Sequence, residues 1–82
     1  MTPTVFNHGN SRFYFFSREE TRMHVHITTP DGEAKFWIEP TVSLATSYNL
    51  TTKTLNRLQK LVGENKDEIK RGWKKHFKSR NN

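Results

Sequence analysis

Residues 23–39, with the sequence MHVHITTPDGEAKFWIE, decide the fold of this chain. Apolar and polar residues alternate from Met23 to Thr28, which is the period of a β-strand with one buried face. Thr29-Pro30-Asp31-Gly32 supplies a turn, and Asp-Gly is a strong hairpin signal. Residues 34–39 return with a second apolar and aromatic run. The stretch therefore predicts a β-hairpin.

The apolar pattern also restricts the register of this hairpin. A two-residue Asp-Gly loop gathers the apolar side chains on one face, and it sets His24 opposite Glu39 and His26 opposite Trp37. A four-residue loop keeps the same faces and shifts each pair by two residues. A three-residue loop mixes polar and apolar groups on one face, so even loop lengths are predicted.

The chain before this hairpin predicts another one over residues 3–16. Turn-forming residues 7–11 separate a short strand from the aromatic run Arg12–Phe16. Both faces of this run are apolar, so it is predicted to be central or covered on both sides. The polar residues 17–22 then form a loop.

The chain after the hairpin predicts helices. A short helix and loop are expected over residues 41–50, followed by a basic helix over residues 51–78 with Thr51 as its N-cap. Apolar residues recur every three or four positions along the basic helix. Gly63 costs about 1 kcal/mol relative to Ala, so the pattern fits one long helix or two nearly collinear ones. Residues 79–82 are expected to be a frayed tail.

The composition fits one small domain of α+β class. The 82 residues are 32% hydrophobic, ten of them are aromatic, and none is cysteine. We expect a small antiparallel sheet of about four strands, packed by the long C-terminal helix, with the short connecting helix between them. We expect neither a disulfide scaffold nor a multidomain enzyme, and neither a signal peptide nor a membrane span. A cytoplasmic location is expected.

The net charge of +6 is concentrated in the C-terminal third. Residues 1–50 carry four Lys and Arg against five Asp and Glu, whereas residues 51–82 carry ten against three. Such asymmetry suggests an acidic partner, meaning nucleic acid, an anionic surface or an acidic protein, although a solvated helix face explains it too. The candidate phosphate contacts on the helix are Lys66, Lys70, Arg71, Lys74, Lys75 and Lys78.

His24 and His26 are the main candidates for chemistry. Two residues apart on a strand, they point to the same side and lie ~7 Å apart. They could act as acid and base with Glu39 orienting one of them, contact phosphate, form a protein interface or ligate a metal. They could also be ordinary solvent-facing residues. No further ligands lie near them, so no metal or cofactor is expected. Trp37 on the same face could stack on a base or be covered by the helix.

The strand His24-Val25-His26-Ile27, followed by Gly32-Glu33-Ala34-Lys35-Phe36-Trp37, resembles a family of small bacterial proteins known only as a domain of unknown function. The resemblance covers nearly the whole chain and departs at Thr21-Arg22-Met23, where prolines are usual. It implies a small protein partner encoded by an adjacent gene, in a layout similar to toxin–antitoxin pairs, and it implies no activity. The signature positions it implies are His24, His26, Glu33, Lys35 and Trp37.

The residues and the resemblance together suggest a toxin-like component of a two-gene module that binds RNA. The basic helix and Trp37 would contact RNA, and His24, His26 and Glu39 are the catalytic candidates for metal-independent cleavage. Such cleavage needs only proton transfer and charge stabilisation, so whether the protein is an enzyme stays open. The alternative is a non-enzymatic protein-binding module, an antitoxin or protein inhibitor, with its basic face against an acidic partner. A nucleic-acid-binding accessory protein is less favoured because no helix-turn-helix is visible.

Overall fold

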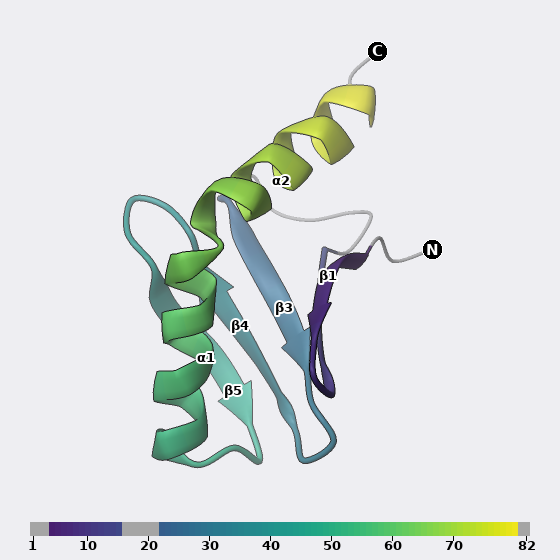
Figure 1. Ribbon diagram of the computed structural model, residues 1–82. Coiled ribbons are helices and arrows are strands. Elements are labelled where there is room, and N and C mark those ends of the chain that lie inside the picture. Colours follow the sequence, from purple (N-terminus) through teal and green to yellow (C-terminus); the bar gives the residue numbers. More distant parts are fainter. Residues whose placement is uncertain (1–3, 16–21, 81–82) are drawn as a thin grey trace.

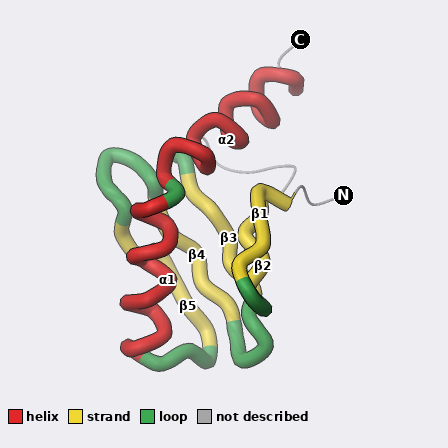
Figure 2. Tube along the Cα trace, in the orientation of Figure 1, coloured by secondary structure: helices red, strands yellow, loops and turns green. Residues whose placement is uncertain are grey.

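The computed structural model of this chain describes residues 4–15 and 22–80, with side chains over residues 6–15 and 22–76. The chain forms five strands and then two helices, which confirms the α+β class (Figures 1 and 2). In chain order the elements are β1 (Thr4–His8), β2 (Ser11–Tyr14), β3 (His24–Thr28), β4 (Glu33–Trp37), β5 (Ser43–Tyr48), α1 (Thr52–Glu64) and α2 (Lys66–Arg80).

The strands form one antiparallel sheet in the order β1-β2-β3-β4-β5, so each strand pairs with its neighbours in sequence. In Figure 1, α1 lies along one face of this sheet, whereas α2 turns away from it beyond the start of β3. Because α1 covers only one face, the topology leaves the other face available for function.

The two hairpins follow the predicted pattern. The first one joins β1 to β2 through Gly9, which has a positive φ of 59°, and β2 lies between β1 and β3 as its two apolar faces predicted. In the second one, Val25 pairs with Phe36 and His24 with Trp37. The β3–β4 loop therefore has four residues, and the even loop length is confirmed. Residues 16–21, which hold the end of the predicted aromatic run and most of the predicted loop 17–22, lie outside the described residues.

The four-residue loop replaces the pairs that a two-residue loop would give. His24 lies opposite Trp37 rather than Glu39, and His26 lies opposite Lys35 rather than Trp37. The longer loop is held by the Thr29 hydroxyl, which accepts hydrogen bonds from the backbone N–H groups of Asp31 at 3.2 Å and Gly32 at 3.1 Å. Such local hydrogen bonds from a Thr side chain favour a turn over continued strand pairing.

The short helix predicted within residues 41–50 is wrong, because β5 occupies Ser43–Tyr48 and makes the sheet five-stranded. A helix of so few residues is not stable by itself, whereas a strand here pairs with the otherwise unpaired edge of β4. Lys35 pairs with Thr46 and Phe36 with Leu44, so Ala45 is an extra residue that forms a β-bulge.

Two helices meet at Asn65. Of the two alternatives for residues 51–78, the structure has two helices, and the one long C-terminal helix of the expected architecture is wrong. The Asn65 side chain donates to the Leu61 carbonyl at 2.8 Å and its backbone N–H donates to the same oxygen at 3.0 Å, which ends α1. Gly63 remains inside α1. Thr51 is the N-cap as predicted, because its hydroxyl accepts from the Thr54 N–H at 3.1 Å. α2 continues to Arg80, beyond the predicted end at residue 78.

The core lies between α1, the start of α2 and one face of the sheet. Val25, Ile27 and Phe36 supply the centre of that face and are fully buried. The other members of this buried cluster are Phe13, Phe15, Met23, Ala34, Ile38, Leu58, Val62, Ile69 and Trp73. α2 therefore contributes two buried residues to the core, Ile69 and Trp73.

Candidate functional site

The sheet face that points away from α1 is here called the open face. Directly paired residues share a face, so the strand register assigns its members. They run across β2 to β5 and comprise Arg12, Tyr14, His24, His26, Thr28, Glu33, Lys35, Trp37, Ser43, Thr46 and Tyr48. Figure 2 shows α1 on the opposite side of the sheet. Both predicted histidines and the predicted tryptophan therefore lie on the same face of the sheet.

His24 and His26 do lie side by side, with ring centroids 5.2 Å apart and planes at 83°. They differ in burial, because His24 is fully buried and His26 is half-buried. The His24 ring packs at 5.6 Å from the ring of Trp37 and at 5.0 Å from that of Trp73. Its Nδ1 lies 2.6 Å from the carbonyl oxygen of Arg22, which can only accept, so Nδ1 carries the proton and donates. His24 is therefore a fixed packing residue, and His26 is the member of the pair that reaches the surface.

Glu39 lies away from the histidine pair. It is exposed at the end of the hairpin, and its carboxylate lies 3.5 Å from the Lys70 Nζ on α2. Its backbone carbonyl accepts a hydrogen bond from the Arg22 Nε at 3.0 Å. The ladder places His24 opposite Trp37 instead, so the expected His24–Glu39 pairing is wrong. Glu39 connects α2 to the segment that enters β3, and the exposed ion pair itself contributes only about 0–1 kcal/mol.

Trp37 is half-buried on the open face, and two cations contact its ring. The guanidinium carbon of Arg22 lies 4.2 Å from its ring centroid, and the Nζ of Lys35 lies 4.6 Å from it. Each such cation–π contact contributes about 0.5–1 kcal/mol at an exposed site. The indole is thus presented on the open face with positive charge on it.

Tyr14 forms a second aromatic position on this face and was not predicted as a site residue. Its ring stacks on that of His26 at 5.5 Å, and the guanidinium carbon of Arg12 lies 4.8 Å from its centroid. Its hydroxyl accepts from the Thr28 hydroxyl at 3.0 Å. The contact with His26 depends on the register of β2 against β3, two strands separated by residues 15–23, so no local signal could have found it.

A shallow hollow of about 230 Å³ lies beside these rings. Tyr48 stands at its edge with 73% of its surface exposed. The residues that line the hollow are Tyr14, His26, Glu33, Ala34, Lys35, Thr46, Ser47 and Tyr48. The hollow thus combines an exposed tyrosine ring with one lysine, Lys35, and one carboxylate, Glu33.

The basic residues of α2 fall on two sides of the helix. Lys66, Lys70 and Lys74 are spaced four apart and share one side, here called the basic row. Lys70 contacts Glu39, so the basic row runs past the end of β4 and adjoins the open face. Arg71 and Lys75 are exposed on a neighbouring side. The side chain of Lys78, also predicted to bind phosphate, lies outside the described residues.

Two further observations concern residues 4–15 and 22–80 only. Within them, no three His, Asp or Glu side chains are grouped so as to hold a metal ion. Neither helix in this part of the chain has the length and apolar character that crossing a membrane requires.

Comparisons with known proteins identify a family. The family model with the description "Domain of unknown function (DUF4160)" matches residues 11–74, and the chain belongs to this family. The matched segment contains every strand of the open face from β2 to β5 and most of both helices. No curated protein and no solved structure matches the chain.

Proposed function

We propose that this DUF4160 protein is the RNA-binding, toxin-like component of a two-gene module in the cytoplasm, and that single-stranded RNA binds on its open face. The observation that carries the proposal is the contact of the Trp37 indole with both Arg22 and Lys35. Stacking of a base on an aromatic side chain contributes about 1–3 kcal/mol, and adjacent cations hold the phosphates.

Lys35 connects the two aromatic positions of the open face. Its Nζ lies 4.6 Å from the Trp37 ring centroid, and the same residue lines the hollow that Tyr48 borders. A phosphate held at Lys35 would have one nucleoside over Trp37 and the next one in the hollow. This arrangement requires unstacked bases, so it favours a single strand over a duplex.

The basic row extends this surface beyond the sheet. Arg22, Glu39 and Lys70 form a continuous line of contacts from Trp37 to α2. Lysines four residues apart on a helix offer a series of charges along which a backbone of phosphates can run. The C-terminal concentration of charge therefore adjoins the aromatic positions.

The geometry supports binding more strongly than cleavage. A proton relay through both histidines needs two rings that reach the substrate, and His24 is fully buried. The Glu39 carboxylate, which was expected to orient one of the rings, pairs with Lys70 instead. His26 alone could transfer a proton to or from RNA.

The test is binding of a labelled single-stranded RNA, measured by fluorescence anisotropy at several salt concentrations. Trp37→Ala should weaken binding by about 5-fold to 150-fold, which corresponds to the loss of one stacked base. Trp37→Phe should retain most of the affinity. Lys53→Met, which removes an exposed lysine from α1, is the matched control for charge. Affinity that is unchanged in Trp37→Ala, or that stays flat as salt rises, would overturn the proposal.

The same samples show whether RNA is cleaved. Intact RNA after incubation is the expected result. Cleavage by the wild-type protein that is lost in His26→Ala, while His26→Ala still binds RNA, would establish catalysis by His26. Circular dichroism of each variant confirms that the fold is retained.

A protein-binding module is the second candidate, and the edge strand β5 favours it. The sequence of β5, Ser43–Tyr48, carries no charge and no proline, although such residues usually protect an edge from pairing with another chain. Leu44 on this strand is 41% exposed. A partner encoded by the adjacent gene could add a strand here. Leu44→Lys should then abolish co-purification of that partner, whereas loss of co-purification only in variants of the basic row would place the partner on α2.

A further inference from the structure

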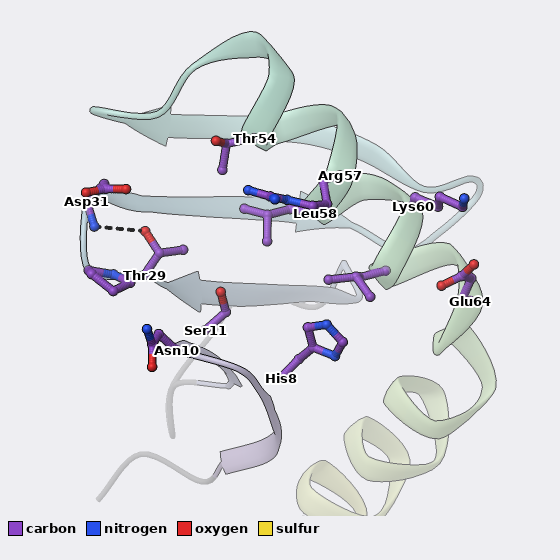
Figure 3. Close-up of a pocket in the computed structure, with 12 residues that line it drawn as sticks. His8, Asn10, Ser11, Thr29, Asp31, Thr54, Arg57, Leu58, Lys60 and Glu64 are labelled. Atoms are coloured by element: carbon purple, nitrogen blue, oxygen red, sulfur yellow. Dashed lines mark hydrogen bonds between the residues drawn. The ribbon is translucent and has the colours of Figure 1, made fainter.

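A second concave surface lies on the α1 side of the sheet, away from the open face. It is a cleft of about 540 Å³ between α1 and the tips of the two hairpins, here called the α1 cleft (Figure 3). The cleft shares no residue with the open face. It is lined from α1 by Thr54, Arg57, Leu58, Lys60, Leu61 and Glu64, and from the hairpins by His8, Asn10, Ser11, Thr29, Pro30 and Asp31.

The α1 cleft combines an apolar wall with nitrogen donors. Leu58 is buried and Leu61 half-buried along its helical side. Figure 3 shows the Arg57 side chain reaching across the cleft from α1 above Leu58, while the His8 ring points into the cleft from the β1–β2 hairpin. The hydroxyl of Ser11 lies on the same hairpin side. A ligand in this space would meet an apolar surface and a guanidinium together.

Arg57 and His8 are not engaged elsewhere. Within residues 6–15 and 22–76, neither side chain makes an ion pair or a hydrogen bond. An arginine guanidinium presents a planar fork of donors that matches two oxygens of a phosphate, and an imidazole N–H adds a further donor. Both groups line the α1 cleft, so each can donate to a ligand bound there.

The carboxylates of the α1 cleft limit the charge of its ligand. Asp31 lies at one end of the cleft and Glu64 at the other (Figure 3). Carboxylates repel a polyphosphate but accept hydrogen bonds from ribose hydroxyls and from the amino groups of bases. The cleft is also much larger than one phosphate ion, and Leu58 offers apolar contact to a ring.

We propose that the α1 cleft binds a nucleoside phosphomonoester. The phosphate lies between Arg57 and His8, and the nucleoside lies against Leu58 and Leu61. This chemistry is shared by a free mononucleotide and by the 5′-phosphorylated end of an RNA strand. The proposal does not depend on the open face, because the two surfaces lie on opposite sides of the sheet.

The test is isothermal titration of the full chain with the four nucleoside 5′-monophosphates, with the unphosphorylated nucleosides and with inorganic phosphate. At least one monophosphate should bind with submillimolar affinity, and its nucleoside and phosphate alone should each bind at least tenfold more weakly. Arg57→Met and His8→Ala should each lower the affinity for the monophosphate by at least tenfold. Arg57→Lys should lose less affinity than Arg57→Met but should not reach that of the wild-type protein.

Two variants locate the site. Lys53→Met, on the same helix but outside the cleft, should leave monophosphate binding unchanged. Trp37→Ala shows whether any of the nucleotide binds on the open face instead. No monophosphate binding at millimolar concentration would overturn the proposal. Binding that survives Arg57→Met and is lost in Trp37→Ala would overturn it too, because the nucleotide would then lie on the open face.

The source of the phosphomonoester is identified by comparing the affinities of two RNA oligonucleotides that differ only at the 5′ end. If the 5′-phosphorylated strand binds more tightly than the 5′-hydroxyl strand, and Arg57→Met removes the difference, the cleft holds an RNA end. If the two strands bind with equal affinity while binding of the free monophosphate still depends on Arg57, the cleft holds a free mononucleotide. RNA binding that fails on the open face while monophosphate binding persists would refute only the proposed function.

Discussion

Gly32→Ala should damage the fold although it adds a single methyl group. Gly32 ends the β3–β4 loop and packs against the end of β5. A Cβ at this position would lie 2.9 Å from the carbonyl oxygen of Asn49 and closer still to that of Tyr48. Both obstacles are backbone atoms, which cannot rotate away as the end of a side chain can. The end of β5 would therefore have to move away from the turn.

The cost of this movement follows from what it disrupts. Asn49, with φ 58°, donates from its side chain to the Asp31 carbonyl at 2.6 Å, and a shift of the chain breaks that bond. A hydrogen bond contributes about 1 kcal/mol net, and overpacking adds about 1–3 kcal/mol. We expect a loss of about 2–4 kcal/mol, against a total stability of about 4–12 kcal/mol for a chain of this length.

The assay is equilibrium unfolding in urea, followed by the fluorescence of Trp37 and Trp73. With a slope of about 1 kcal/mol per molar urea for a small domain, the midpoint should fall by about 2 M or more. Gly9→Ala is the matched control, because Gly9 has φ 59° and nothing within 4 Å of an added Cβ, so only the local backbone cost of about 1–2 kcal/mol remains. A Gly32→Ala midpoint no lower than that of Gly9→Ala would refute the described packing of β5 on the turn.

Three further outcomes are expected. Gly63→Ala should raise stability by about 0.5–1 kcal/mol, because Gly63 is inside α1 with open space around it; an unchanged urea midpoint would contradict this. Thr51→Ala should lower stability by about 1 kcal/mol through loss of the N-cap, whereas Thr51→Ser should keep it, and thermal unfolding by circular dichroism separates the two. In RNA binding, the double variant Lys70→Met/Lys74→Met should lose more affinity than Arg71→Met/Lys75→Met, although both remove two charges. Equal losses in anisotropy would show that only the total charge matters.

The β3–β4 hairpin was predictable because its signals are local. The alternation from Met23 to Thr28 decides which side chains lie on the apolar face of the strand. Because directly opposed residues share a face, only an even number of loop residues pairs apolar with apolar side chains. The choice between two and four residues depends on the hydroxyl of Thr29. That choice decides whether Glu39 or Trp37 lies opposite His24. The histidine pair was therefore predictable as a pair, whereas the partner of His24 was not.

The errors in the second half of the chain have identifiable physical causes. The bulge at Ala45 breaks the two-residue period of β5, so the spacing of Leu44, Ala45 and Tyr48 imitates one face of a helix. Asn65 continues the apolar stripe in spacing, but its side chain binds the Leu61 carbonyl and ends α1. In both places one residue departs from a regular pattern that its neighbours maintain.

The site residues that were missed depend on pairings between distant segments. Tyr14 meets His26 only through the β2–β3 ladder, and the α1 cleft joins a helix to two hairpin tips. Neither arrangement leaves a period or a spacing in the sequence. Arg57 and His8 therefore read in the sequence as one surface cation and one loop histidine.

The placement of the charge on α2 follows from its two buried residues. Ile69 and Trp73 are four apart and both enter the core, which fixes the rotation of the helix about its axis. With that rotation, Lys70 falls beside Glu39, and the whole basic row follows it along the same side. Arg71 and Lys75 are turned further from this contact. The fold thus arranges part of the positive charge of the C-terminal third into a row next to the open face, and this is why two charge-matched double variants should differ in RNA binding.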